Sequence, residues 1–272
     1  MTADITIVIV SYNTRADLEA CLTSLAAAPP ARVARTVVAD NASTDGTQAR
    51  LREAWPAVSL IAMDANAGFA AANNAALRDV ETRLALVLNS DTIVPAGAID
   101  RLAQRLDDTG AVAAGPRLVD AQGHPEISFG PMLTPLAEWR QRRLVRRAAS
   151  DAPADRAATR ELVSREQTVD WVSGACLLLG TAEARAVGFF DERFFMYEED
   201  VDLCASLRAR GGRILFTPAA EITHLRGRSV RAAGALASPH YDRSHLAFYD
   251  KHAPRWAPWL RLSLKLRGRP IR

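Results

Sequence analysis

The chain has few cysteines and no long apolar run, and each scarcity excludes a class of protein. Its three cysteines (Cys21, Cys176 and Cys204) are widely spaced and form no C-x-x-C pair. We therefore expect neither a disulfide framework nor a cysteine metal site, and a reduced, cytoplasmic setting. No apolar stretch approaches the roughly eighteen residues that a membrane-spanning helix needs. Because 49% of the residues are hydrophobic and 24% are charged, wholesale disorder is excluded as well.

The net charge of +3 is small, but its distribution is uneven. Basic residues concentrate in 140–147 and 251–272, which indicates an anionic partner surface. Few aromatic residues lie between these basic residues, so we expect no nucleic-acid partner. Residues 252–272 combine Trp256 and Trp259 with six basic residues and no acidic one. Such a tail favours the headgroup region of an anionic membrane, and a tail packed on its own domain is the alternative.

Short apolar runs alternate with amphipathic stretches through the first 115 residues. Strands are predicted at residues 5–10, 36–39, 58–62, 84–88 and 111–114, with helices between them. This alternation predicts an α/β fold with a Rossmann-like, mostly parallel central sheet flanked by helices. Ligands of such sheets bind beyond the carboxyl ends of the strands, so the residues that follow each strand are candidates for a site.

The second half of the chain is less regular. Residues 140–168 are rich in Arg, Ala and Asp without apolar periodicity, and predict a mobile loop. Order resumes with a strand at 169–179, a short helix at 181–187, an amphipathic helix at 198–210 and a strand at 214–216. No internal repeat relates this half to the first.

The residues after the first strands differ from those of a dinucleotide-binding site. Residues 11–13 stand where G-x-G-x-x-G is expected, which weighs against a nicotinamide or flavin enzyme. Asp40 ends the second strand, where a carboxylate can accept a hydrogen bond from a base or ribose. Asn66 and Gly68 precede the next helix, and a glycine there permits close approach of a diphosphate to the helix N-terminus. An ordinary polar loop is the alternative for these two residues.

Acidic residues mark two further positions. Asp91 follows the fourth strand, where its oxygens can hold Mg²⁺ or Mn²⁺ beside a diphosphate or merely cap the turn before Pro95. Residues 198–202 carry four carboxylates, which a helix dipole stabilises and which include a candidate general base. His224 follows the last predicted strand, where a lone histidine is usually structural.

Taken in order, seven short motifs resemble those of the family 2 glycosyltransferases, and within that family most of all the bacterial rhamnosyltransferase branch. Each motif alone is weak, but the ordered set is specific. The motifs lie between residues 4 and 230 and are Val8–Asn13, Asp40–Gly46, Asn66–Asn73, Leu88–Asp91, Trp171–Ala175, Phe189–Leu203, and His224 with Gly227 and Ser229.

The resemblance implies a GT-A fold and a metal-dependent, inverting transfer of a sugar from a nucleotide diphosphate to a hydroxyl group. It implies that Asp200 is the catalytic base, with Glu199 as its neighbour, and that Asp91 and His224 hold the metal. The residues implied to contact the donor nucleotide are Ser11, Tyr12, Asn13, Asp40, Asn66, Gly68, Asn73, Asn89 and Ser90. Those implied to border the acceptor or the donor sugar are Trp171, Gly174 and Asp202.

One position departs from the family pattern. Asn89 stands where the family's D-x-D motif has its first carboxylate. The cation, Mg²⁺ or Mn²⁺, therefore depends on Asp91, His224, diphosphate oxygens and water, and we expect its binding to be weak without the nucleotide.

The resemblance also implies the partners. We expect dTDP-L-rhamnose as the donor, with a UDP-sugar (galactofuranose, N-acetylglucosamine or another hexose) as the alternative. The acceptor is a cell-surface glycan or a polyprenyl-diphosphate-linked saccharide precursor. We expect residues 1–115 to bind the nucleotide sugar and 116–235 to bind the acceptor within one GT-A domain. The basic tail, 236–272, would make the protein peripheral on the inner face of the plasma membrane.

Two further classes of protein fit the sequence less well. A nucleotidyltransferase normally carries a glycine-rich basic loop after the first strand, and residues 11–14 contain no glycine. A non-catalytic nucleotide-sugar-binding protein would be expected to lose Asp91 or Asp200, and both are present. Glycosyl transfer is therefore the function that the sequence favours.

Overall fold

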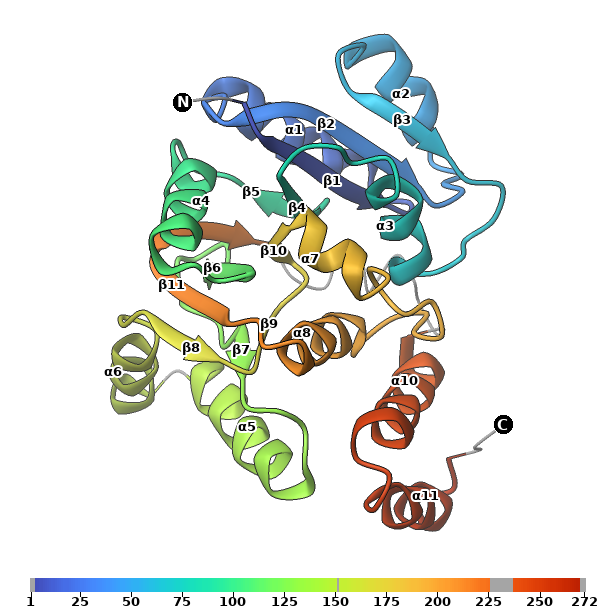
Figure 1. Ribbon diagram of the computed structural model, residues 1–272, viewed down its shortest axis with the longest axis vertical. Coiled ribbons are helices and arrows are strands. Elements are labelled where there is room, and N and C mark those ends of the chain that lie inside the picture. The colour runs from blue at the N-terminus through green and yellow to red at the C-terminus, as the bar shows by residue number, and fades with distance from the viewer. Residues whose placement is uncertain (1–2, 151, 226–236, 270–272) are drawn as a thin grey trace.

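The computed structural model describes residues 3–150, 152–225 and 237–269 of the chain. Gly227 and Ser229, two positions of the last motif, lie outside them. Strands and helices alternate through the first half, and the predicted α/β class is confirmed (Figure 1). The elements of this half are β1 (Ile5–Ser11), α1 (Arg15–Ala27), β2 (Val33–Asp40), α2 (Thr47–Ala54), β3 (Ser59–Ala62), α3 (Phe69–Leu77), β4 (Leu84–Asn89), β5 (Thr92–Ile93), α4 (Ala98–Thr109) and β6 (Ala113–Val119).

The second half contributes three more strands to the main sheet and all of the remaining described helices. Its elements are β7 (Phe129–Gly130), α5 (Pro135–Ala148), α6 (Pro153–Leu162), β8 (Gln167–Val169), β9 (Trp171–Val172), β10 (Cys176–Gly180), α7 (Thr181–Ala186), α8 (Glu199–Ala209), β11 (Ile214–His224), α10 (Ala237–His252) and α11 (Ala257–Leu266).

Nine of the described strands form one sheet in the order β3-β2-β1-β4-β10-β6-β11-β5, with β8 paired to β11 outside this path. Strands β1 to β4 pair in parallel, and so do β6 and β11. Strand β10 lies between these groups and runs antiparallel to both β4 and β6. The predicted mostly parallel sheet is therefore confirmed, and the carboxyl ends of β1, β2 and β4 meet at one edge.

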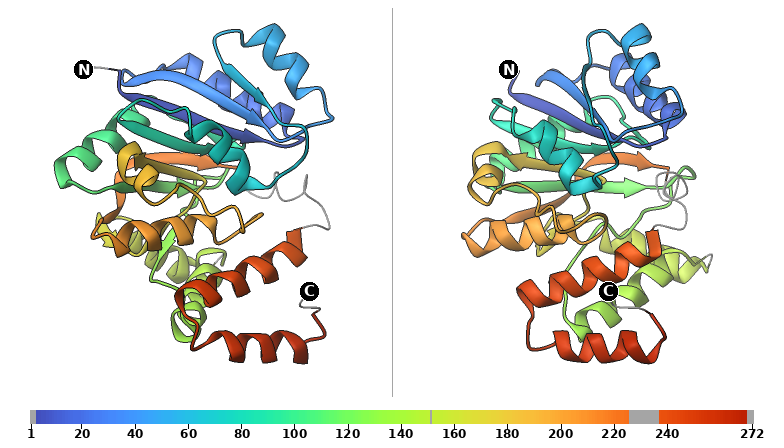
Figure 2. Two further views of the ribbon diagram at one scale, coloured as in Figure 1. Left: turned by 45° about the vertical axis from the view of Figure 1, so that its right-hand side comes forward. Right: turned by 90° about the vertical axis from the view of Figure 1, so that its right-hand side faces the viewer.

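The side chains of β1 alternate between two apolar layers, as expected for a buried strand. Ile5, Ile7 and Ile9 pack into the layer that includes α1 and α4, whereas Val8 packs into the layer that includes α3, α7 and α8. Figure 2 shows helices on both faces of the sheet. The covered sheet is a rigid support for the loops at its carboxyl edge.

Residues 140–168, predicted to be a mobile loop, are largely helical. They contain most of α5, all of α6 and the first two residues of β8. The prediction was wrong because it relied on the apolar periodicity of helices packed on a core, whereas α5 buries none of its residues and α6 buries only Thr159. Local signals mark the start of α5 nonetheless: the Thr134 side chain accepts a hydrogen bond from the Ala137 amide, and Pro135 occupies the first turn.

Two predicted strands have different bounds in the structure. The strand predicted at 169–179 is divided among β8, β9 and β10, and a turn at 173–175 separates the last two. The strand predicted at 214–216 continues to His224 as β11, with a register shift between Thr217 and Glu221. This longer strand brings His224 into register with Thr92 of β5, directly after Asp91.

The C-terminal segment, predicted to be a basic tail, is a pair of helices packed on the domain. Phe248 and Tyr249 of α10 and Ala257 of α11 are buried in a small separate core with Leu133 and Phe194. None of the described helices has both the length and the apolar character that a bilayer crossing requires.

The large apolar side chains that stay exposed among the described residues all belong to α5 and α11. They are Leu136, Trp139, Val145, Trp259, Leu262 and Leu266. Figures 1 and 2 place both helices at the end of the molecule opposite α2. We call these six side chains, with the basic residues of the same two helices, the α5–α11 surface.

Candidate active site

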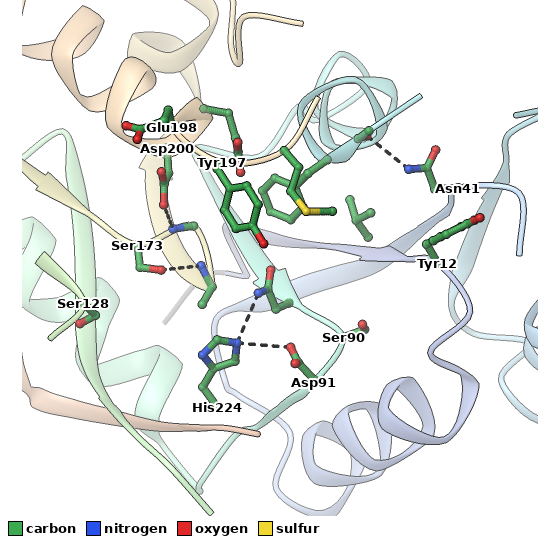
Figure 3. Close-up of a pocket in the computed structure, with 18 of the residues that line it drawn as sticks. Tyr12, Asn41, Ser90, Asp91, Ser128, Ser173, Tyr197, Glu198, Asp200 and His224 are labelled. Atoms are coloured by element: carbon green, nitrogen blue, oxygen red, sulfur yellow. Dashed lines mark hydrogen bonds and ion pairs between the residues drawn. The ribbon is translucent and has the colours of Figure 1, made fainter. Parts of the chain in front are cut away.

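A cavity of about 610 Å³ opens at the carboxyl ends of β1 and β4 and is closed on its other side by the loop before α8 (Figure 3). Eleven of the residues implied by the resemblance line it: Tyr12, Asn66, Gly68, Asn89, Ser90, Asp91, Trp171, Gly174, Glu199, Asp200 and His224. Segments from both halves of the chain therefore meet in one cavity.

One wall of the cavity is a polar loop network around Asn41. The Asn41 side-chain amide donates to Asn66 Oδ1 at 2.8 Å and to the Gly68 carbonyl at 3.3 Å. Its oxygen accepts from the Ala67 amide at 2.9 Å. Gly68 has a φ of 89°, and a Cβ there would lie 2.4 Å from the Phe195 carbonyl oxygen. Glycine is therefore required at this position for backbone conformation and for space.

Three residues implied to contact the donor lie behind the cavity wall. The Ser11 hydroxyl bonds to Thr14, which bonds to Ser90 at 2.9 Å. Asn13 has a positive φ of 53° and accepts from the Thr44 amide. The Asn73 side chain donates to the Phe69 carbonyl. These residues do not line the cavity and instead brace the loops that do.

Asp40 is also behind the wall. It is fully buried, and its Oδ2 accepts hydrogen bonds from the Ser43 amide at 3.1 Å and from Gln48 Nε2 at 2.8 Å. Its Oδ1 has no hydrogen-bond partner in the described part of the chain. Asn41, the next residue, is the one that lines the cavity.

Asp91 and His224 lie together at the base of the cavity, at the ends of β4 and β11. Asp91 Oδ1 is 3.4 Å from His224 Nε2, and His224 Nδ1 is 3.5 Å from Glu126 Oε2. Burial alone would lower the pKa of His224, but its ion-pair contacts with the Asp91 and Glu126 carboxylates outweigh burial and raise the pKa to about 9. Glu126 also lines the cavity, and no motif in the sequence pointed to it.

The atoms of this pair suit a divalent cation. Asp91 Oδ1 is buried and has no hydrogen-bond partner among the described residues. Two atoms 3.4 Å apart can both reach one cation at the usual ligand distances of about 2.0–2.2 Å. No group of three or more His, Cys, Asp and Glu side chains is arranged around a single metal position in the described ranges. The residues present therefore fit a cation that takes its other ligands from a diphosphate and water.

Asp200 stands at the start of α8 with both carboxylate oxygens held by backbone amides. Oδ2 accepts from Gly174 N at 2.7 Å, and Oδ1 accepts from Val201 N at 2.8 Å. Burial raises the pKa of Asp200 to about 6, although the two backbone hydrogen bonds lower it. The charge of Glu198 adds to the increase. Burial and the charge of Asp200 raise the pKa of Glu199 well above its usual range. Asp200 is therefore a fixed carboxylate poised to take up a proton near neutral pH.

Asp202, implied to border the acceptor or the donor sugar, points elsewhere. It is buried outside the cavity, where its carboxylate pairs with Lys251 at 2.8 Å and His252 at 2.6 Å. Helix geometry explains the difference, because residues two apart on a helix lie on nearly opposite faces. Since Asp200 faces the cavity, Asp202 faces α10.

Several cavity residues were not assigned from the sequence. Asn41, Tyr197 and Glu198 belong to the quoted motifs, and their positions beside assigned residues were the available signal. Ser128 comes from an irregular segment that carries no motif. Such residues are brought to the cavity only by the fold.

The α/β sheet, mostly parallel and with the cavity at its strand ends, is the GT-A fold. Two solved structures share the fold. One is GalNAc-T7 with UDP, GalNAc and Mn²⁺ (TM-score 0.61, 16% identity, 81% of this chain and 42% of that chain). The other is the mannosyltransferase PcManGT from Pyrobaculum calidifontis with GDP-Man and Mn²⁺ (TM-score 0.61, 18% identity, 96% of this chain and 69% of that chain).

Sequence comparison gives the family. Residues 3–257 match the family described as "Glycosyltransferase like family 2", and the chain belongs to it. It is 31% identical to the N-acetylglucosaminyl-diphospho-decaprenol L-rhamnosyltransferase of Mycobacterium tuberculosis, over 97% of this chain and 90% of that protein. A shorter match joins it to the rhamnosyltransferase WbbL of Escherichia coli, 35% identical over 24% of this chain and 25% of that protein. The expected GT-A fold and glycosyltransferase class are confirmed.

Proposed function

We propose that this glycosyltransferase moves L-rhamnose from dTDP-L-rhamnose to a hydroxyl group of a polyprenyl-diphosphate-linked saccharide, with inversion at the anomeric carbon. The observation that carries the proposal is the desolvated Asp200, held by two backbone amides in the same cavity as the Asp91–His224 pair. The full-length similarity to an L-rhamnosyltransferase that is named for a diphospho-decaprenol-linked substrate supports the choice of donor and acceptor.

Asp200 acts as the general base in this proposal. The acceptor hydroxyl loses its proton to Asp200 while its oxygen attacks the anomeric carbon from the face opposite the nucleoside diphosphate. A positioned base contributes about 10²–10⁴-fold to such a step. Burial and the charge of Asp200 raise the pKa of Glu199, which favours the neutral form of Glu199 beside an ionised Asp200.

Asp91 and His224 would hold Mg²⁺ or Mn²⁺ together with the donor diphosphate. When bound, the cation offsets the negative charge that develops on the leaving diphosphate. Chelation with EDTA should abolish transfer, and addition of Mn²⁺ or Mg²⁺ should restore it. Asp91→Ala should raise the metal concentration needed for half-maximal transfer, and an unchanged requirement would contradict this role.

Tyr12 is the proposed nucleoside contact, because it lines the cavity at the end of β1. Asp40 lies behind the wall, so the imide contact implied for it by the resemblance is not part of this proposal. Thermal shift with dTDP, UDP and GDP tests this. We expect stabilisation by dTDP and, to a smaller extent, by UDP, and stabilisation by GDP alone would contradict it.

The overall reaction is tested with a panel of nucleotide sugars and a short-chain polyprenyl diphosphate that carries N-acetylglucosamine. Transfer from dTDP-L-rhamnose, with an inverted linkage by NMR, is the expected product. Transfer from a UDP-sugar instead would keep the enzyme class and change the donor.

We propose further that the protein docks on the cytoplasmic face of an anionic membrane through the α5–α11 surface. The exposed apolar side chains of this surface lie among exposed arginines of α5 and exposed basic residues of α11, including Arg140, Arg143, Arg261 and Lys265. Such a combination suits a headgroup region, where each basic residue contributes about 1 kcal/mol. Because a polyprenyl-linked acceptor lies in the same membrane, docking through this surface would bring the enzyme to its acceptor.

A further inference from the structure

Residues 198–202 carry four carboxylates, and the structure gives each a different environment. Glu199 and Asp200 belong to the catalytic cavity, and Asp202 pairs with Lys251 and His252 of α10. Glu198 both lines the cavity and pairs with α10. Among these four residues, Glu198 is therefore the one that both lines the cavity and contacts α10.

Glu198 is held in an unusual backbone conformation. Its φ of 68° lies in the left-handed region, directly before the first turn of α8. Its side chain is 8% exposed, and Oε1 lies 3.0 Å from His245 Nδ1. Its Oε2 is buried and has no hydrogen-bond partner among the described residues. A strained residue that keeps one buried carboxylate oxygen unsatisfied beside a cavity points to a missing ligand.

His245 is itself fixed from the other side. Its Nε2 lies 3.3 Å from Glu138 Oε2, and the Tyr249 hydroxyl donates to the other oxygen of Glu138. The His245 ring is 4% exposed and stacks on Tyr241 with ring centroids 5.4 Å apart. The imidazole is thus clamped between a carboxylate of α5 and Glu198, so it determines where the Glu198 carboxylate lies.

The place of Glu198 along the cavity indicates which substrate it meets. In Figure 3, Glu198 and Tyr12 lie at opposite ends of the cavity, and Asp200 lies on the Glu198 side. If the nucleoside binds at Tyr12, the opposite end of the cavity, beyond the general base Asp200, is the place for the acceptor, whose hydroxyl gives up its proton to that base. A carboxylate oxygen there can accept a hydrogen bond only from a donor group, and saccharide hydroxyls are such donors.

We propose that Glu198 is an acceptor-binding residue whose Oε2 accepts a hydrogen bond from a hydroxyl of the acceptor saccharide, and that His245 is the residue that positions it. This inference rests on the proposed function, because it takes Asp200 as the base. An acceptor without that hydroxyl leaves a buried carboxylate oxygen unpaired and is rejected for that reason.

The test compares acceptor kinetics with donor hydrolysis in the full chain. The probes are dTDP-L-rhamnose and N-acetylglucosaminyl diphosphate on a short polyprenyl chain. Glu198→Gln keeps the size of the side chain and removes its charge. We expect the acceptor KM to rise about tenfold or more, as for loss of a charge-assisted hydrogen bond. Donor hydrolysis without acceptor, measured at about pH 8, should change much less than the acceptor KM, because the Glu198 charge acts on this rate only through the pKa of Asp200.

Two substitutions at His245 separate positioning from folding. His245→Asn keeps a donor near the place of Nδ1 and should retain most of the acceptor affinity. His245→Leu removes that donor and should raise the acceptor KM as Glu198→Gln does, and the double variant should be no worse than either. His252→Leu is the matched control, since it breaks a similar carboxylate contact on the same helix outside the cavity. It should lower Tm without changing the acceptor KM.

The possible failures are distinguishable. An unchanged acceptor KM in Glu198→Gln, or a parallel loss of donor hydrolysis, would overturn the assignment of Glu198 and leave glycosyl transfer intact. If His252→Leu raised the acceptor KM as much as His245→Leu does, the effect of His245 would be structural and His245 would not position Glu198. A wild-type chain that releases sugar from no nucleotide donor would overturn the proposed function, and this inference with it.

Discussion

Asp200 Oδ2 accepts a 2.7 Å hydrogen bond from the backbone amide of Gly174, a residue 26 positions earlier in the chain. The contact ties the start of α8 to the turn between β9 and β10. A Cβ on Gly174 would lie 3.3 Å from the Asp200 Cβ, so the close approach needs a glycine or a small shift. The orientation of the carboxylate is thereby determined in advance of substrate binding, which reduces the cost of ordering it during the reaction.

Asp200→Asn should lower the kcat of transfer about 10²–10⁴-fold, because the amide keeps the shape of the side chain and cannot accept the proton. Binding of dTDP by thermal shift should be retained. Asp202→Asn is the matched control: it weakens the buried contacts to Lys251 and His252, so it should lower Tm while folded protein keeps transferring sugar. Near-normal transfer by Asp200→Asn would contradict the assignment of the base.

The pH profile of kcat should show an acid limb near pH 6, the raised pKa of Asp200. The base works only when ionised, so activity is present above this pKa and is lost as the pH falls through it. The rate is measured from about pH 4.5 to about pH 9 with acceptor saturating, and folding is checked at each pH by circular dichroism. An acid limb near pH 4, where an ordinary aspartate titrates, would show that burial does not raise this pKa.

Gly68→Ala should damage both stability and activity. Its Cβ would meet the Phe195 carbonyl at 2.4 Å and push away the segment that leads to Glu198 and Asp200. A misplacement of about 1 Å there is expected to cost transfer about 100-fold. Gly123→Ala is the control, because Gly123 also has a positive φ but a Cβ added there would meet nothing within 4 Å. It should lower Tm slightly and leave transfer unchanged; equal losses of activity in both variants would contradict the steric argument.

The double variant Trp139→Ser, Trp259→Ser should lose binding to vesicles of phosphatidylcholine and phosphatidylglycerol while donor hydrolysis continues. Wild-type protein should sediment with these vesicles at low salt and be released at high salt, because screening weakens the contribution of the basic residues. Vesicles of phosphatidylcholine alone are the control for charge. Equal sedimentation of the variant and the wild type would remove the α5–α11 surface from membrane docking.

Substitutions test this surface better than truncation does. Removing the residues after Asp250 would delete Lys251 and His252, which pair with Asp202 of α8. A truncated chain would therefore lose contacts that hold α8 in place as well as the α11 part of the α5–α11 surface. Trp139 and Trp259 are more than half exposed, so changing them leaves the packed core in place.

The α/β class and the strand ends of the first half follow from the sequence alone. Their signals are local: β-branched runs such as 5–10, separated by amphipathic stretches, predict buried parallel strands whatever the rest of the chain does. Because parallel strands align their carboxyl ends, the sequence is enough to place Tyr12, Asn66 and Asp91 at one edge of the sheet. The ordered motifs then pointed to the family.

Only the tertiary structure decided which of the four carboxylates in 198–202 faces the substrates. Their spacing is compatible with several orientations of α8, and contacts from Gly174, His245 and Lys251, all distant in sequence, select one. Likewise, only the fold brings Glu126 to His224, because Glu126 lies in a segment without a motif. Helix α5 buries none of its residues, so it lacks the buried apolar stripe by which such a helix is usually recognised. Local patterns specify elements, whereas the direction of a side chain at an element's end depends on the neighbours that folding brings to it.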